Sequence, residues 1–243
     1  MQNAAEKLIM TYDPNMGSSE KVIGEQPECI TCSHKLRDGV IEHYDENSVL
    51  RKVEVPDGAL WSRNHLTFSD IGGVAYFDSE HNLHNDNGPA VEYAGGGRRA
   101  WWIHGKRHRE NGPALIDRMG TEEWYQNGEL HRENGPAVTS PMGGEIWAQR
   151  GLTHRENGAA VTHPDGTQEW YLHGELHRED GPSVIYPDGS SEWISDGQRH
   201  RTDGPAIEVP SHPEKNEWWL NNQRFESESE WNQAVKEYQN GLL

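Results

Sequence analysis

The segment Trp170–Glu192 reads WYLHGELHREDGPSVIYPDGSSE and is one unit of a tandem repeat. The unit Trp124–Ile146 reads WYQNGELHRENGPAVTSPMGGEI, with the same aromatic start and the same HRExGP segment. Tryptophans open the units at a spacing of 23 residues, at Trp101, Trp124, Trp147, Trp170 and Trp193. Histidines follow seven residues after each Trp, and glycines four residues later again, at His108, His131, His154, His177, His200, Gly112, Gly135, Gly158, Gly181 and Gly204. A fixed period of this length predicts a repeat architecture.

Two kinds of turn divide each unit. Asn127–Gly128 and His173–Gly174 are tight-turn pairs, because their residues tolerate a positive φ. Asp165–Gly166 and Asp188–Gly189 form a second set of turns in the same units. The runs between the turns are short and β-prone, which is typical of hairpins and not of helices. One hairpin cannot bury its own face, but stacked hairpins can. The sequence therefore predicts an all-β, solenoid-like stack of antiparallel β-hairpins.

The repeat register weakens toward the N-terminus and stops before the C-terminus. Phe77 takes the Trp position of an upstream unit, and Trp61 heads a weaker one. Trp218 opens a half unit that never reaches the HRxxGP segment. We therefore divide the chain into an atypical N-terminal capping segment at 1–60, in which 34–47 reads as a worn copy, repeats at 61–225, and a C-terminal cap at 226–243.

The cap is predicted to be a short amphipathic helix. Ser227 or Ser229 suits the N-cap, acidic residues follow in the first turn, and Gly241 ends the segment. The helical spacing places four apolar or aromatic residues on one face, at Trp231, Ala234, Val235 and Tyr238.

Composition narrows the class of partner. The net charge is −18, so the phosphates of nucleic acid would be repelled and direct nucleic-acid binding is not expected. A protein partner with a basic surface suits the charge better, and the plain alternative is that the charge only keeps the chain soluble. No run approaches the ~20 apolar residues of a membrane span, and the N-terminus lacks a signal-peptide pattern. We expect a cytoplasmic protein that uses no membrane.

The unit W-Y-x-[NH]-G-x-x-H-R-[ED]-[DN]-G-P-A-V-x-x-P-D-G resembles a variant of the MORN repeat. It departs from the ordinary repeat where Arg follows the His, and where Gly-Pro-Ala is added. This variant resembles repeat proteins of bacteriophages, large viruses and bacteria, including antitoxin-like and immunity-like proteins. The resemblance covers about residues 61–225 and implies a hairpin scaffold for interactions, in the host cytoplasm if the chain is viral. Phospholipid binding, often proposed for the eukaryotic family, needs a basic face, which a charge of −18 disfavours.

The recurring His-Arg pairs have two interpretations. In the functional one, rows of imidazole and guanidinium hold phosphate or a nucleotide. In the structural one, which we favour, each His bonds a turn carbonyl and each Arg pairs with a nearby Glu, because a group present in every unit usually makes the units stack. The candidate binding residues in this ladder are His108, Arg109, His131, Arg132, His154, Arg155, His177 and Arg178.

Departures from the repeat are further candidates. Arg98 and Arg99 form a local basic spot beside Trp102, and Arg150 replaces the usual turn residue of its unit. These positions either contact a partner or reflect simple drift. Cys29 and Cys32 form a CxxC pair with His34 and His43 nearby, a weak zinc candidate because a structural site usually has a second ligand pair. Two ordinary thiols are the more economical interpretation, and we expect no cofactor.

We therefore expect a non-enzymatic protein that binds, and inhibits, a basic partner protein through its acidic surface. The chain has no nucleophile elbow, no phosphate loop opening a helix and no HExxH motif, so no enzymatic hypothesis has a site to rest on. The alternative function is capture of a nucleotide or phosphate by the His-Arg ladder. Open hairpin edges would also allow the chain to form a homodimer.

Overall fold

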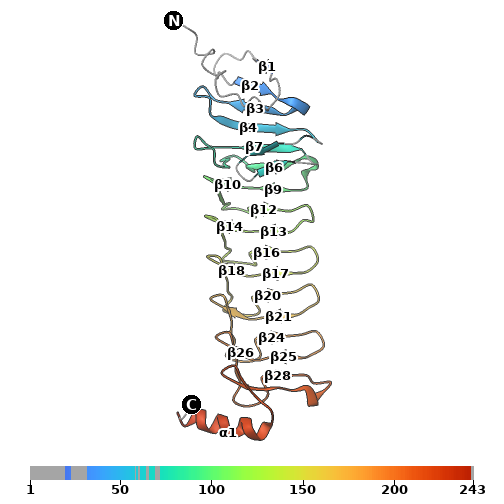
Figure 1. The fold of residues 1–243 in the computed structure, drawn as a ribbon, viewed down its shortest axis with the longest axis vertical. Helices are drawn as coiled ribbons and strands as arrows, with labels where there is room; N and C mark the ends of the chain where they lie inside the picture. Colours follow the sequence, from blue (N-terminus) through green and yellow to red (C-terminus); the bar gives the residue numbers. More distant parts are fainter. Residues whose placement is uncertain are drawn as a thin grey trace. The chain divides into compact units, whose positions relative to one another are not determined.

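The computed structural model describes residues 20–22, 32–57, 59, 61–63, 66–68 and 72–241 (Figure 1). The chain divides into two compact units. The first unit runs to Gly120 and also holds Tyr125–Gly128, and the second holds Thr121–Trp124 and the chain from Glu129 onward. Each unit is built on an antiparallel sheet, and we describe the two separately.

The sheet of the first unit has the strand order β1-β2-β3-β4-β7-β8-β9-β12. Two small hairpins accompany it: β5 (Trp61–Arg63) pairs with β6 (Leu66–Phe68), and β10 (Trp102–Ile103) pairs with β11 (Lys106–Arg107). The sheet strands are β1 (Glu20–Val22), β2 (Cys32–Lys35), β3 (Ile41–Tyr44), β4 (Leu50–Val55), β7 (Gly73–Tyr76), β8 (Val91–Tyr93), β9 (Arg99–Ala100) and β12 (Leu115–Ile116). The unit also holds β14 (Tyr125–Gln126) and the 3-10 turns η2 (Arg37–Gly39) and η3 (Ala94–Gly96).

A conventional apolar core lies in the first unit. Leu50 and Val53 of β4 and Ala75 of β7 are completely buried. Phe77, which takes the Trp position of its repeat, packs into the same cluster. The longer strands at this end bury larger aliphatic side chains, so this part of the chain depends less on the repeat pattern.

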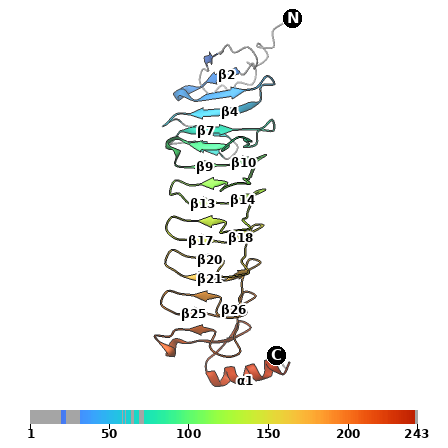
Figure 2. The same cartoon turned by 180° about the vertical axis from the view of Figure 1, so that it is seen from behind.

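The sheet of the second unit has the strand order β13-β16-β17-β20-β21-β24-β25-β28. Two strands per repeat enter it, and a small hairpin lies beside each such pair (Figure 2). The sheet strands are β13 (Glu122–Glu123), β16 (Val138–Thr139), β17 (Glu145–Ile146), β20 (Val161–Thr162), β21 (Gln168–Glu169), β24 (Val184–Ile185), β25 (Ser191–Glu192) and β28 (Ile207–Glu208). The small-hairpin strands are β15 (Glu129–Leu130), β18 (Ala148–Gln149), β19 (Leu152–Thr153), β22 (Tyr171–Leu172), β23 (Glu175–Leu176), β26 (Ile194–Ser195) and β27 (Gln198–Arg199).

The turn residues adopt the backbone conformation that their sequence predicts. His173 and Gly174 have φ of 53° and 91° between β22 and β23, so both central residues are left-handed. The second set of turns uses one left-handed glycine each, with φ of 94° at Gly166 and 82° at Gly189. These turns force the chain to reverse every few residues, which confirms the predicted all-β stack of antiparallel hairpins.

The repeats of the second unit are held together by a thin core. The residue two positions after the repeat glycine is fully buried in each unit, as Ala137, Ala160, Ser183 and Ala206. The carbonyl of this residue accepts the N–H of the Trp that opens the unit, as in Trp147 N to Ala160 O at 2.7 Å. The buried column of the second unit is therefore built from small side chains.

The chain ends in the predicted helical cap. Strands β29 (Trp218–Leu220) and β30 (Gln223–Phe225) form the last hairpin after the 3-10 turn η4 (Pro213–Lys215), and α1 (Glu228–Gln239) packs on it. Ser227 is the N-cap, with its side chain accepting the N–H of Glu230. Three residues of the predicted apolar face are buried: Trp231, Ala234 and Val235. Gly241 follows the helix with a φ of 69°. In the part of the chain that the structure describes, no helix is long and apolar enough to span a bilayer.

Candidate functional site

The arginine of each repeat stacks on the tryptophan that opens the same repeat. The guanidinium carbon lies over the ring face, close enough for a cation–π contact. Its Nη1 also donates to the carbonyl four residues on, for example Arg132 to Pro136 O at 3.0 Å. The distances from guanidinium carbon to ring centroid are 3.9 Å for Arg109–Trp101, 3.8 Å for Arg132–Trp124, 3.8 Å for Arg155–Trp147, 4.1 Å for Arg178–Trp170 and 3.9 Å for Arg201–Trp193.

The glycine three residues after each arginine makes room for that guanidinium. A Cβ placed on Gly135 would lie 2.9 Å from Cζ of Arg132, and one on Gly204 would lie 2.8 Å from Cζ of Arg201. Both distances are shorter than any normal carbon contact. The motif HRxxGP is therefore a structural fastener: Arg stacks on Trp, bonds the backbone, and lies where a side chain of the glycine would be.

The histidine of each repeat joins that repeat to the next. Its Nδ1 faces the backbone N–H of the left-handed residue in the next tight turn. At His177 and His200 it also faces a side-chain oxygen of that residue, Asp196 Oδ1 at 2.9 Å and Asn221 Oδ1 at 2.6 Å. The sequence predicted a bond to a turn carbonyl. At His108, His131 and His154 the prediction is wrong, because the turn presents a backbone N–H. The N-to-Nδ1 distances are 3.2 Å for His104–His84, 3.1 Å for Asn127–His108, 3.1 Å for Arg150–His131, 3.2 Å for His173–His154, 3.3 Å for Asp196–His177 and 3.3 Å for Asn221–His200.

The predicted Arg–Glu pairs also need correction. At Arg201, carboxylates do join the fastener, since its guanidinium contacts both Asp203 and Glu208 at 2.7 Å. At Arg155 and Arg178 the guanidinium instead stacks on the tryptophan and donates to a backbone carbonyl, at 2.8 and 3.1 Å. The aromatic face and the carbonyl supply contacts that sequence reasoning assigned to acids.

The four irregular candidates lie in different settings. Arg98 is exposed, with its guanidinium 5.3 Å from the ring centroid of Tyr93. Arg99 is half-buried beside Trp101, at 5.9 Å. Trp102 opens β10 and packs against a neighbouring arginine of β11. Arg150 is exposed at the left-handed turn position, with φ of 51°.

The candidate zinc residues are only partly visible. Cys29 lies outside the described residues, as does the side chain of Cys32. His34 packs edge-on against Tyr44 at 5.4 Å. His43 lies 2.9 Å from Ser33 Oγ through Nδ1 and 3.1 Å from Glu54 Oε1 through Nε2. Both nitrogens of His43 are thus engaged by neighbours, and zinc binding by this group stays a prediction.

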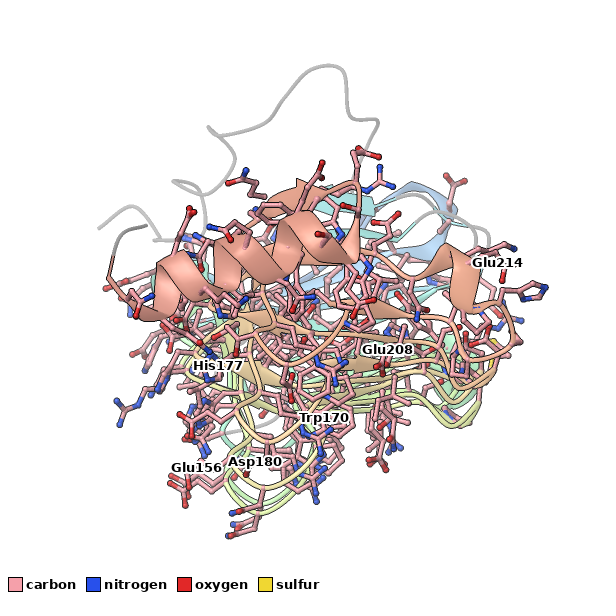
Figure 3. All side chains as sticks on the ribbon, turned by 90° about the horizontal axis from the view of Figure 1, so that it is seen from below. Glu156, Trp170, His177, Asp180, Glu208 and Glu214 are labelled. Carbon is pink, nitrogen blue, oxygen red and sulfur yellow. The ribbon has the colours of Figure 1, made fainter. Side chains whose placement is uncertain are left out.

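A row of exposed acids follows the fasteners of the second unit. Four carboxylates form this acidic edge and all four are exposed: Glu133, Glu156, Glu179 and Asp180. Figure 3, which looks along the stack, places Glu156 and Asp180 at the same margin and Glu214 at a distant one. Since each repeat adds two strands at about 4.8 Å each, successive glutamates lie about 10 Å apart. Within the described residues, none of the four is held in an ion pair.

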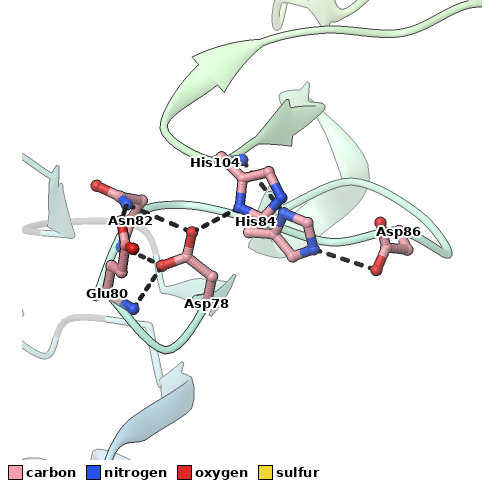
Figure 4. A network of polar contacts seen from close by, with 6 residues as sticks. All are labelled: Asp78, Glu80, Asn82, His84, Asp86 and His104. Atoms are coloured by element: carbon pink, nitrogen blue, oxygen red, sulfur yellow. Dashed lines mark hydrogen bonds and ion pairs between the residues drawn. The ribbon is translucent and has the colours of Figure 1, made fainter.

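A second polar group joins the repeat headed by Phe77 to the repeat headed by Trp101, and within the described residues it is the one group of His, Cys, Asp or Glu side chains with metal-ligand spacing. Its members are Asp78, His84 and His104, which we call the Asp78 cluster (Figure 4). Asp78 Oδ2 lies 3.0 Å from His104 Nδ1, and the rings of His84 and His104 stack at 4.4 Å. Burial raises the pKa of the Asp78 carboxyl, but hydrogen bonds from His104, from the backbone and side chain of Asn82, and from the backbone of Glu80 outweigh it and hold the pKa below its usual value.

Sequence reasoning missed the Asp78 cluster because its members are 26 residues apart and belong to different repeats. A signal was present nonetheless. Asp78 stands where later units have an aromatic or aliphatic residue, and His104 stands at a turn position that later units fill with several residue types. The available clue was that Asp78 and His104 both depart from the repeat pattern, at two positions that the His ladder brings together.

Comparison with known proteins adds no family to this picture. Neither a protein-family model nor a curated protein matches the chain.

Proposed function

We propose that this chain is a non-enzymatic binding protein that holds and inhibits a partner protein with a basic surface. The observation that carries the proposal is the acidic edge, where Glu133, Glu156, Glu179 and Asp180 stand exposed on successive repeats. Carboxylates that make no ion pair with the described residues remain available to lysines and arginines of a partner. The overall charge of −18 would further speed association with such a partner.

The competing proposal, nucleotide or phosphate capture by the His-Arg ladder, has less support. Each ladder arginine already covers a tryptophan face and donates to a backbone carbonyl, as Arg155 does with Trp147 and Ala159. Each ladder histidine already has its Nδ1 against the next turn, facing a backbone N–H at His108, His131 and His154 and the Asp196 carboxylate at His177. A ligand would have to displace contacts that hold the repeats together, at a cost in stability.

The setting that we propose for the binding protein is phage counter-defence, or antagonism of the antitoxin or immunity type, in the cytoplasm. This setting rests on the resemblance of the repeat to MORN-type proteins, and that resemblance is itself a proposal. A basic enzyme that itself handles nucleic acid is the partner class that the charge best suits, because such a protein carries a positive groove that an acidic edge would cover.

The test compares two variants with the same change in charge. In the edge variant, Glu133, Glu156 and Glu179 become Gln, and in the control Glu129, Glu145 and Glu175 become Gln; all six are exposed. A protein captured from lysate by the wild-type chain is identified, purified, and its Kd measured for each form at low and high salt. We expect the edge variant to bind at least about tenfold more weakly, since three lost contacts of ~0.5 kcal/mol each give about that factor.

The control variant is expected to stay within about twofold of the wild type. Equal weakening of both variants would mean that binding depends on the total charge of the protein and not on the acidic edge. Binding that is indifferent to both salt and the edge substitutions would refute the proposal.

A further inference from the structure

The Asp78 cluster brings two imidazoles and a carboxylate together at one exposed corner of the first unit. Each of Asp78, His84 and His104 offers one ligand atom, and these atoms all lie within 4.8 Å of one another. We propose that the cluster is a binding site for a divalent transition-metal ion of the Zn²⁺ type. Imidazole nitrogen with one carboxylate oxygen suits Zn²⁺ and its neighbours, whereas Mg²⁺ and Ca²⁺ prefer oxygen ligands throughout.

The carboxylate of Asp78 is positioned like a metal ligand. Its Oδ1 accepts the backbone N–H groups of Glu80 and Asn82, each at 2.9 Å, which fixes the orientation of the group. Its Oδ2 accepts the side-chain N–H of Asn82 at 3.3 Å and faces His104 Nδ1 at 3.0 Å. The side chain is only 9% exposed, so a cation there would meet an ionised and largely desolvated oxygen. A metal ion between Oδ2 and Nδ1 would take the place of the proton that now joins them.

The second histidine is oriented by a carboxylate of its own. His84 Nε2 lies 3.1 Å from Asp86 Oδ2, which directs Nδ1 toward the cluster (Figure 4). Metal-binding histidines commonly donate their remaining N–H to a carboxylate in this way. The Nδ1 of His84 now accepts the His104 N–H at 3.2 Å, and that one long bond would be exchanged for the metal. His104, whose side chain is 71% exposed, gives the ion access from solvent.

The chain contains a matched pair that separates this site from the ordinary ladder. His154 and His173 occupy the same two registers, stack at 4.7 Å and make the same bond of 3.2 Å. Ala148 stands there in place of Asp78. The ladder thus forms without the aspartate, and of these two stacked histidine pairs the one at His84 and His104 has a carboxylate oxygen beside it.

The experiment measures Zn²⁺ affinity and stoichiometry on the full chain by equilibrium dialysis. All variants carry Cys29→Ser and Cys32→Ser, so that the thiols cannot supply the ligands. His104→Asn removes one ligand, and Asn is native at the same left-handed register in Asn127 and Asn221, so folding is retained. Asp78→Asn removes the second ligand type, and His173→Asn is the control in the matched pair.

We expect the thiol-free chain to bind one Zn²⁺, and His104→Asn and Asp78→Asn each to weaken that affinity by about 100-fold or more, since losing even an outer partner costs about 10–100-fold. His173→Asn should leave it within about twofold. A thiol-free chain that binds no Zn²⁺ would overturn the proposal. So would binding that survives His104→Asn, or an equal loss in the His173→Asn control. Thermal melting of His104→Asn shows that a loss of affinity is not a loss of folding.

Discussion

The pairing of Arg132 with Gly135 can be tested by a double-mutant cycle. A Cβ on Gly135 would lie 2.9 Å from Cζ and 3.0 Å from Nε of Arg132, while the φ of Gly135 is not in the left-handed region. Gly135→Ala therefore adds a methyl group that collides with the guanidinium and causes no backbone strain. We expect it to lower the free energy of unfolding by about 1–3 kcal/mol, as overpacking in a tight site does.

The partner substitution has a separate cost. Arg132→Ala removes a guanidinium that lies 3.8 Å from the Trp124 ring centroid and donates to Pro136 O at 3.0 Å. A desolvated cation–π contact contributes about 0.5–2 kcal/mol, and a hydrogen bond from a charged group about 1.5–3 kcal/mol. Because such terms are not additive, we expect a total loss of about 2–4 kcal/mol.

The double variant gives the decisive number. Without the guanidinium, the methyl group of Gly135→Ala meets open space, so its cost should vanish or turn into a gain of about 0.4–1 kcal/mol from a less flexible unfolded chain. Urea denaturation followed by far-ultraviolet circular dichroism measures each free energy, with m-values compared across the cycle. Gly88→Ala is the matched control, because Asn85 replaces the arginine there and its Nδ2 would lie 3.6 Å from the new Cβ.

The same cost for Gly135→Ala with and without Arg132 would refute the idea that the glycine exists to seat the guanidinium. A cost at Gly88→Ala as large as that at Gly135→Ala would refute it independently, since no guanidinium lies at that position.

Three further outcomes follow from the structure. Ala160→Leu should cost about 1–3 kcal/mol in urea denaturation, because Ala160 is completely buried in a closely packed column. Burial, aided by a hydrogen bond to Glu192, raises the pKa of Tyr186 to about 12, so the folded state keeps a proton that the unfolded state loses near its usual value of 10. Stability should therefore fall as pH rises from about 10 to 12, and Tyr186→Phe should reduce that slope in denaturation series at several pH values. Trp231→Ala should cost about 3–5 kcal/mol and increase hydrogen exchange in the last hairpin, whereas Ser227→Ala should cost about 1 kcal/mol.

The hairpin stack was predictable because its determinants are local. Pairs such as His173–Gly174 set the turns by their own backbone preferences, and the structure places both residues in the left-handed region. The helical cap was predictable for the same reason, since Ser227 and the spacing of Trp231, Ala234 and Val235 act within one helix. Each of these features needs only its neighbours in sequence.

The roles of the ladder residues were not predictable in the same way. A sequence reveals that His131 and Arg132 recur, but not that the imidazole meets an N–H of the next turn, or that the guanidinium prefers a tryptophan face to a glutamate. Those choices depend on which groups the stacked turns present, and a left-handed residue such as Arg150 directs its N–H at the preceding repeat. Register can be found in a sequence, whereas the direction of a hydrogen bond between repeats depends on the folded backbone.

The same geometry explains why some repeat positions hold the fold together and others are available for binding. The guanidinium of a recurring fastener is already held by a tryptophan face and a backbone carbonyl, as at Arg132 and Arg155, so little of it remains for a ligand. Polar groups that can bind a ligand are therefore expected where a side chain points away from the fastener, as at Glu156, or where a repeat has lost its usual residue, as at Asp78. Both proposals for this protein therefore concern positions outside the Arg–Trp fastener. They are also independent: the acidic edge lies in the second unit, and substitution of Glu156 leaves every ligand of the Asp78 cluster in place. The partner-binding and Zn²⁺ measurements should accordingly respond to separate sets of variants, and a single variant that abolished both would point to lost folding.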